Sequence, residues 1–127
     1  MVSKPRFTPE PTSAPGDFYV EYGCCATCGI PQSIAPDLVG WTDHTPGLHC
    51  RWIKQPSTPE ELIRAFAIFS EREMCCHRYA GTDPAIQARV GIQNCDHPVI
   101  VEPQEIPRDR DLARLSIFNP ETTRELR

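Results

Sequence analysis

Residues 17–29, DFYVEYGCCATCG, join a strand pattern directly to a cluster of cysteines. The first six residues combine aromatic and β-branched side chains with acids, which predicts a short β-strand ending at Gly23. Cys24, Cys25 and Cys28 follow at once. Because thiolates bind soft metals and take part in redox chemistry, this stretch predicts a metal or redox site beside a sheet.

The cysteine count of the whole chain supports this prediction. Seven cysteines cannot all pair within one chain, and residues 1–16 lack the apolar core of a secretory signal. We therefore expect a cytoplasmic protein whose cysteines serve metal or redox chemistry in preference to a disulfide framework.

The composition limits the size of the fold and the kinds of partner. With 127 residues the chain suits one domain with a tail, and its 14 prolines are about double the usual share of roughly 5%. The net charge of −4 argues against nucleic acid as a partner. No segment approaches the roughly 18 consecutive apolar residues that span a membrane, so we expect no membrane partner either.

Short strands and helices alternate along the rest of the chain. Residues 39–41 and 50–54 are strand-like and flank a turn-rich stretch, which predicts a β-hairpin. A helix is predicted from Thr58 to about Met74, with capping-box spacing between Thr58 and Glu61. The other predicted elements are a helical turn over 31–38, a helix from Asp83 and Pro84 to Gly91, a strand at 99–102 and a short helical segment at 111–117.

These elements predict an α+β fold in three parts. Residues 1–16 are expected to form a flexible, proline-rich arm, residues 17–98 the folded domain, and residues 99–127 a C-terminal extension. The aromatic residues at helical spacing within 58–74 are expected to face the core.

The cysteine run resembles the cluster loop of single-cluster bacterial ferredoxins. Bacterial cluster-binding loops follow C-x2-C-x2-C-x3-C-P. At the four cysteine positions this chain has Cys25, Cys28, Pro31 and Ala35, followed by Pro36. Two of the four cysteines are present, so the motif is degenerate. Proline cannot bind iron, so a ligand is lost at Pro31.

The resemblance extends over residues 17–81. In such ferredoxins a strand and a helix follow the loop, and a final cysteine lies near the end of that helix. Cys75 and Cys76 occupy that place here. The resemblance implies a ferredoxin-like fold, with a short antiparallel sheet and two main helices on one face. It also implies a 4Fe-4S or 3Fe-4S cluster.

The ligands implied by the resemblance are Cys25, Cys28 and Cys76. Cys50 from the hairpin is the expected replacement for the ligand lost at Pro31, and Cys24 is a further candidate. Cys24 and Cys75 each neighbour a proposed ligand. Adjacent side chains in extended structure point in opposite directions, so these two are expected chiefly as buried thiols.

Zinc is an alternative to a cluster. One Cys-x2-Cys pair with two distant Cys or His ligands forms a tetrahedral site. Cys25 and Cys28 could join Cys76 with His49, Cys50 or His77 in this way. Cys95 is expected to have a structural role.

Two functions of different classes follow from these observations. The first is an electron carrier that donates single electrons from an iron–sulfur cluster to a protein redox partner. The second is a cluster-free binding module of inhibitor or immunity type, which binds a protein target stoichiometrically and holds a structural zinc or no metal. No catalytic motif is present, so an enzyme is not expected.

Overall fold

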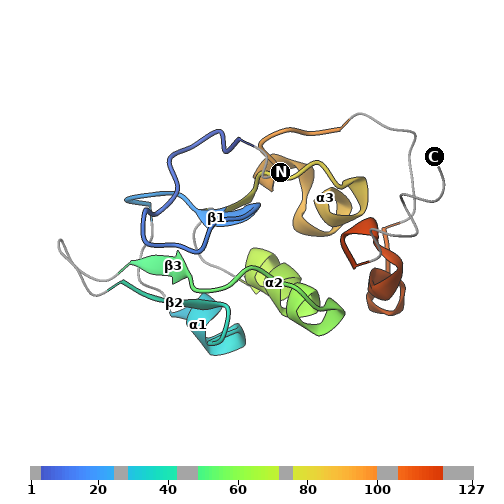
Figure 1. Ribbon diagram of the computed structural model, residues 1–127, viewed down its shortest axis with the longest axis horizontal. Helices are drawn as coiled ribbons and strands as arrows, with labels where there is room; N and C mark the ends of the chain where they lie inside the picture. Colours follow the sequence, from blue (N-terminus) through green and yellow to red (C-terminus); the bar gives the residue numbers. More distant parts are fainter. Residues whose placement is uncertain (1–3, 25–28, 43–48, 72–75, 100–105, 119–127) are drawn as a thin grey trace.

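The computed structural model describes residues 4–24, 29–42, 49–71, 76–99 and 106–118. These residues combine helices and strands, in agreement with the predicted α+β class (Figure 1). Their strands form two separate two-stranded antiparallel sheets rather than the single short sheet that was expected. One pairs β1 (Phe18–Val20) with β4 (His77–Tyr79), and the other pairs β2 (Val39–Trp41) with β3 (Cys50–Trp52).

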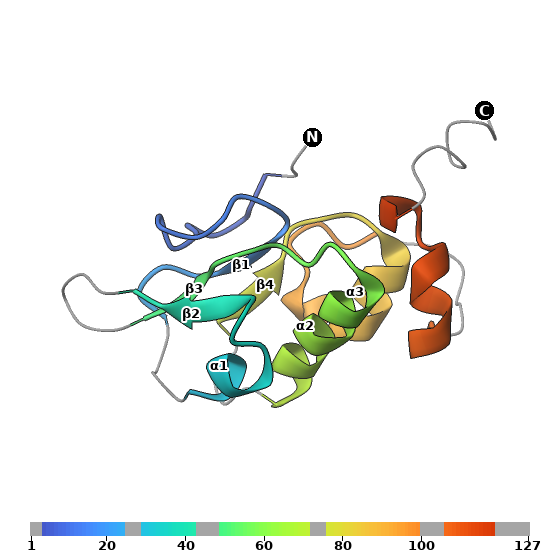
Figure 2. The same ribbon diagram turned by 60° about the horizontal axis from the view of Figure 1, so that its bottom comes forward.

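The predicted hairpin and helices are confirmed, and their described bounds differ by a few residues from the predicted ones. The helices are α1 (Ile30–Ile34), α2 (Pro59–Glu71) and α3 (Pro84–Val90), and three short 3₁₀ turns follow them: η1 (Ile92–Asn94), η2 (Asp109–Arg114) and η3 (Ser116–Phe118). The α2 helix contacts α1, α3 and η2, so it connects the two ends of the molecule. In Figures 1 and 2, α1 and α2 lie on one side of the strands.

A single core joins the two sheets. The ring of Phe18 on β1 lies 5.5 Å from that of Trp52 on β3 and 5.0 Å from that of Tyr79 on β4, between centroids. Phe69 on α2 completes this aromatic group at 6.1 Å from Phe18. Rings at such separations add stability beyond the area that they bury. The α2 side chains that reach the core include the predicted Leu62, Phe66 and Phe69 at helical spacing, together with Ala65 and Ile68.

The N-terminal residues of the described chain form turns and bends and lie against both sheets. Glu10 N donates to the carbonyl of Val20 at 2.9 Å, and Tyr22 N donates to the carbonyl of Thr8 at 2.7 Å. Further along, Ala14 N donates to the carbonyl of Trp52 on β3. Figure 2 shows this segment crossing the strands on the side away from α1. The segment predicted as a flexible arm therefore covers the second face of the strands.

The C-terminal part adds a further layer beside α2. Asp83 caps α3, because its Oδ1 accepts from Ala85 N at 2.9 Å, and Gly91 ends the helix at φ +93°. Leu112 in η2 is fully buried, close to the helical segment predicted at 111–117. Val99 belongs to no strand, and the rest of the strand predicted at 99–102 lies outside the described residues.

The start of α2 is stabilised by a carboxylate. Thr58 Oγ1 accepts from Glu61 N at 3.1 Å. The Glu61 carboxylate in return accepts from Ser57 N at 2.9 Å and from Lys54 Nζ at 2.5 Å. The reciprocal bond of the predicted capping box thus goes to Ser57 rather than to Thr58. These partners, Lys54 first, lower the pKa of Glu61 to about 2.

Acidification should therefore weaken the fold through Glu61. A carboxyl whose pKa is lowered by folding stabilises the protein above its unfolded pKa of about 4.5, and this contribution is lost as the pH falls toward 2. We expect Glu61→Gln to reduce the loss of stability over this pH range, measured by urea unfolding. Glu60→Gln, at an exposed position one residue earlier, should retain the wild-type pH dependence. Identical pH dependence in all three proteins would contradict the prediction.

Candidate cysteine site

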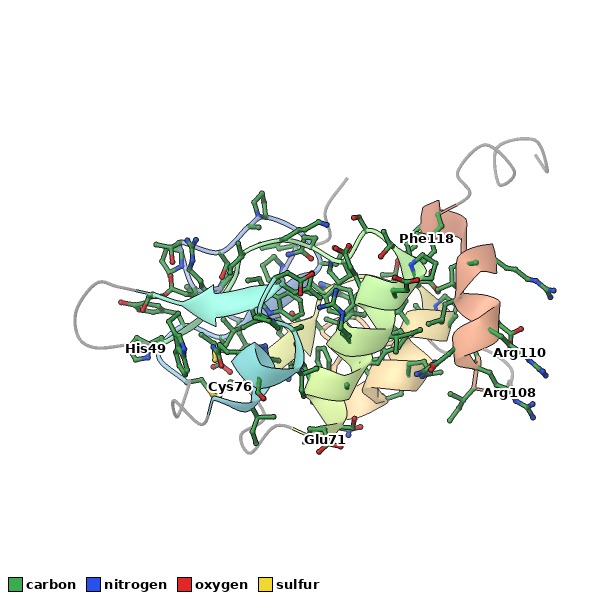
Figure 3. All side chains as sticks on the ribbon, turned by 90° about the horizontal axis from the view of Figure 1, so that it is seen from below. His49, Glu71, Cys76, Arg108, Arg110 and Phe118 are labelled. Carbon is green, nitrogen blue, oxygen red and sulfur yellow. A yellow bond between two sulfur atoms is a disulfide. The ribbon has the colours of Figure 1, made fainter. Side chains whose placement is uncertain are left out.

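A disulfide joins Cys24 to Cys76 across 52 residues of sequence, with 5.6 Å between the two Cα atoms. Cys76 is 2% exposed, whereas Cys24 is half-buried and packs against the edge of the core. Figure 3 labels Cys76 toward one end of the molecule. The bond brings together two stretches of the sequence that each contain more than one cysteine.

Backbone hydrogen bonds position the two cysteines independently of the sulfur–sulfur bond. The β1–β4 ladder pairs Val20 with His77 and continues beyond it, because Glu21 N donates to the carbonyl of Cys76 at 2.9 Å. The carbonyl of Glu21 accepts from Cys24 N at 3.2 Å, across a turn that contains Gly23 at φ +79°. Glycine suits this left-handed conformation. Glu21 thus holds Cys24 and Cys76 near each other through its backbone.

Cys50 lies in the core on β3, and its sulfur accepts a hydrogen bond from Gln32 Nε2 at 3.2 Å. The same amide nitrogen of Gln32 also donates to the carbonyl of Gly40 at 3.0 Å, which ties α1 to the hairpin. Trp52, two residues after Cys50, donates from Nε1 to His77 Nδ1 at 3.2 Å, and both of these side chains are buried. This bond links the strand of Cys50 to the residue that follows Cys76.

His49 precedes Cys50 and has a buried ring nitrogen. Its backbone N donates to Thr42 Oγ1 at 3.0 Å, which continues the hairpin beyond β3. Within the described part of the chain, His49 Nδ1 is buried without a hydrogen-bond partner. In the view of Figure 3, His49 and Cys76 lie toward the same end of the molecule. A buried ring nitrogen of this kind, when unprotonated, can accept a hydrogen bond or bind a metal.

The structure describes some of the predicted ligands and not others. Cys50 and Cys76, together with the further candidates Cys24 and His49, lie in described segments. Cys25, Cys28 and Cys75 lie outside the described residues. Among the described residues, no group of three or more His, Cys, Asp or Glu side chains is arranged to hold a metal ion.

The pairing of Cys24 with Cys76 differs from the expectation from the sequence. Cys76 was expected as a ligand, Cys24 chiefly as a buried thiol, and a disulfide framework was disfavoured. A sulfur in a disulfide is not a thiolate, so Cys76 can bind a metal only after this bond is reduced. The pairing depends on the register of β1 against β4, two strands with no sequence signal that they are neighbours.

Cys95 lies apart from these residues, where Gly91 ends α3. Its sulfur donates to the carbonyl of Gly91 at 3.4 Å. Burial raises the pKa of the Cys95 thiol to about 11, so the side chain is a neutral thiol at physiological pH. Such a residue packs in the core and has little reactivity.

A second polar cluster, around Asp96, was also missed. The buried Asp96 carboxylate accepts from Arg78 Nε at 2.5 Å, from Arg6 N at 2.7 Å and from the Tyr19 hydroxyl. Burial and then this hydrogen bond raise the pKa of Tyr19. The Arg78 guanidinium also lies 4.6 Å from the centre of the Phe7 ring. Because its polar atoms have partners, we interpret the cluster as an anchor that holds the N-terminal segment on β1 and β4.

A comparison with known protein families, curated proteins and solved structures finds no match to this chain. The likeness to single-cluster ferredoxins therefore rests on the cysteine motif and the order of elements. Among the described segments, no helix has the length and apolar character needed to cross a membrane.

Proposed function

We propose that the protein is a ferredoxin-like electron carrier that binds an iron–sulfur cluster with cysteine thiolates and donates single electrons to a protein partner. The supporting observation is that two cysteine-containing stretches, separated by 52 residues, meet at one end of the molecule. Neither stretch alone supplies four cysteines, so a four-thiolate site needs such a meeting.

Cysteine thiolates suit a soft metal group, and Cys76 can become one once its bond to Cys24 is reduced. Cys76 and Cys50 both lie in apolar surroundings, and Cys25 and Cys28 follow Cys24 directly in the sequence. When bound, the cluster would supply reversible one-electron chemistry. The chain would supply thiolates, exclude water and donate hydrogen bonds to sulfur, which tune the reduction potential. The bond from Gln32 Nε2 to Cys50 Sγ is of this kind.

The charge of the chain suits a basic partner surface. With 17 acidic and 13 basic residues, the protein would associate weakly, rapidly and in a salt-sensitive manner with a positively charged redox enzyme. We propose the cytoplasm as its location, because a reducing compartment keeps ligand thiols available.

Ligand substitution tests the proposal. We expect wild-type protein purified without oxygen to be brown, with near-stoichiometric iron and sulfide. Cys28→Ser should lose most of its iron, because serine, a poor ligand for iron, replaces one thiolate of the C-x2-C pair. Visible absorption and iron and sulfide analysis measure this loss.

Cys95→Ser is the matched control. This substitution removes a buried sulfur that donates a hydrogen bond to the carbonyl of Gly91 and is not among the proposed ligands. The iron content of the variant should therefore equal that of the wild type. Iron retained by Cys28→Ser would show that the ligand set is wrong. Colourless, metal-free and folded wild-type protein would reject the electron carrier.

A cluster-free binding module is the second candidate, and the disulfide favours it. The Cys24–Cys76 bond holds the two stretches together without a metal, as a stoichiometric inhibitor or immunity-type protein would need. A metal-free protein that is stably folded in its oxidised form would support this candidate. Stoichiometric zinc without iron would instead support a structural zinc site that includes Cys25 and Cys28.

A further inference from the structure

The two cysteines of the Cys24–Cys76 disulfide differ in their exposure to solvent. Cys76 is 2% exposed in the core, whereas Cys24 is half-buried at its edge. Thiol–disulfide exchange proceeds by attack of an incoming thiolate on one sulfur while the other departs as a thiolate, and access decides which sulfur is attacked. An incoming thiol therefore reaches Cys24 first, and the departing sulfur is that of Cys76.

We propose that this disulfide is a reversible switch, which a cellular dithiol reduces by attack on Cys24 and which thereby releases Cys76 as a free thiol in the core. In a reducing cytoplasm, disulfides are characteristically transient and redox-sensing. The consequence for metal binding rests on the proposed function, because Cys76 is one of its ligands. The exchange chemistry does not depend on that function.

The reaction balances with a dithiol as the reductant. One thiolate of the dithiol forms a bond to Cys24 Sγ, and the bond between the two protein sulfurs breaks with its electron pair on Cys76 Sγ. The second thiol of the reductant, as a thiolate, then attacks the reductant sulfur that is bonded to Cys24. A disulfide forms within the reductant, and Cys24 leaves as a thiolate. The dithiol is oxidised to a disulfide, and the protein gains two electrons and two protons.

The structure keeps the two cysteines close after reduction. Glu21 bonds through its N–H to the carbonyl of Cys76 and through its carbonyl to Cys24 N, and neither bond involves sulfur. The bond from Trp52 to His77 further fixes the residue next to Cys76. Reduction should therefore leave the positions of both backbones in place, so that oxidation reforms the same bond. This retained geometry makes the switch reversible.

Mass spectrometry of the oxidised, full-length wild-type protein tests the site of attack. The folded protein is exposed briefly to glutathione, a monothiol that leaves the mixed disulfide in place, then acid-quenched, alkylated and digested. We expect the glutathione adduct on Cys24 in roughly tenfold excess over Cys76, with the Cys76 thiol alkylated. An adduct mainly on Cys76, or no exchange until the protein is unfolded, would overturn the proposal.

Iron loading then tests the consequence separately. Oxidised wild-type protein should take up iron and sulfide only after treatment with dithiothreitol, whereas Cys24→Ser should load without prior reduction. Cys95→Ser should keep the wild-type dependence on dithiothreitol. Loading of wild-type protein with the Cys24–Cys76 bond intact would overturn the switch and leave the proposed cluster standing. Exchange at Cys24 without iron uptake in any form would support the exchange reaction and overturn the electron carrier.

Discussion

Replacing Asp96 with alanine is expected to lower the free energy of unfolding by about 3–5 kcal/mol. The Asp96 side chain is fully buried and that of Arg78 is 11% exposed, so the substitution leaves an uncompensated charge in the interior. Arg6 N and the Tyr19 hydroxyl lose the same acceptor. Because Asp96 joins the N-terminal segment to β1 and β4, we expect the substitution to lower the stability of the whole fold. Denaturant unfolding followed by circular dichroism measures it.

The control is a second aspartate–arginine pair on the surface. Asp109 bonds to Arg89 at 2.7 Å, but its side chain is 57% exposed. Exposed ion pairs contribute about 0–1 kcal/mol, so Asp109→Ala should cost no more than that. Similar losses in Asp96→Ala and Asp109→Ala would show that the buried cluster does not hold the fold together.

Loss of the Cys24–Cys76 disulfide is expected to lower the unfolding free energy by about 4 kcal/mol. Reduction restores the freedom of the unfolded chain over a 52-residue separation, and the chain-entropy relation assigns a loop of this length about that value. The native backbone bonds around Glu21 remain, so the change acts chiefly on the unfolded state. Guanidinium unfolding of the oxidised and reduced wild type measures the difference.

The double variant Cys24→Ser/Cys76→Ser provides the control for this prediction. Its stability should match that of the reduced wild type, and a dithiol should not change it further. A stability equal to that of the oxidised wild type would mean that the bond contributes nothing to the fold. A further loss on adding dithiol would point to a second disulfide.

Helix ends and the hairpin were predictable because their signals are local. Thr58 and Glu61 at the start of α2, and Asp83 and Gly91 around α3, act on backbone groups within a few residues. The described part of the long helix ends at Glu71, and the predicted end at Met74 lies outside the described residues. The aromatic residues of α2 faced the core as their spacing indicated.

The candidate site was less predictable because its parts come from distant segments. The motif singled out Cys25 and Cys28, and only the resemblance to ferredoxins added Cys76 from the distant stretch, without indicating that it pairs with Cys24. Asp96 lacked any motif, and its importance follows only from its burial beside Arg78. The N-terminal proline-rich segment gave no periodic signal. Its backbone bonds to Val20 and Trp52 require both sheets to be in place.

The α+β class, the hairpin and the positions of the main helices could be predicted from local sequence, because capping, turns and periodicity depend on neighbouring residues. The pairing of β1 with β4, which brings Cys24 to Cys76, became apparent in the folded chain alone. The register of strands separated by more than fifty residues depends on packing the whole core around Phe18, Trp52 and Tyr79, and no local pattern contains that packing.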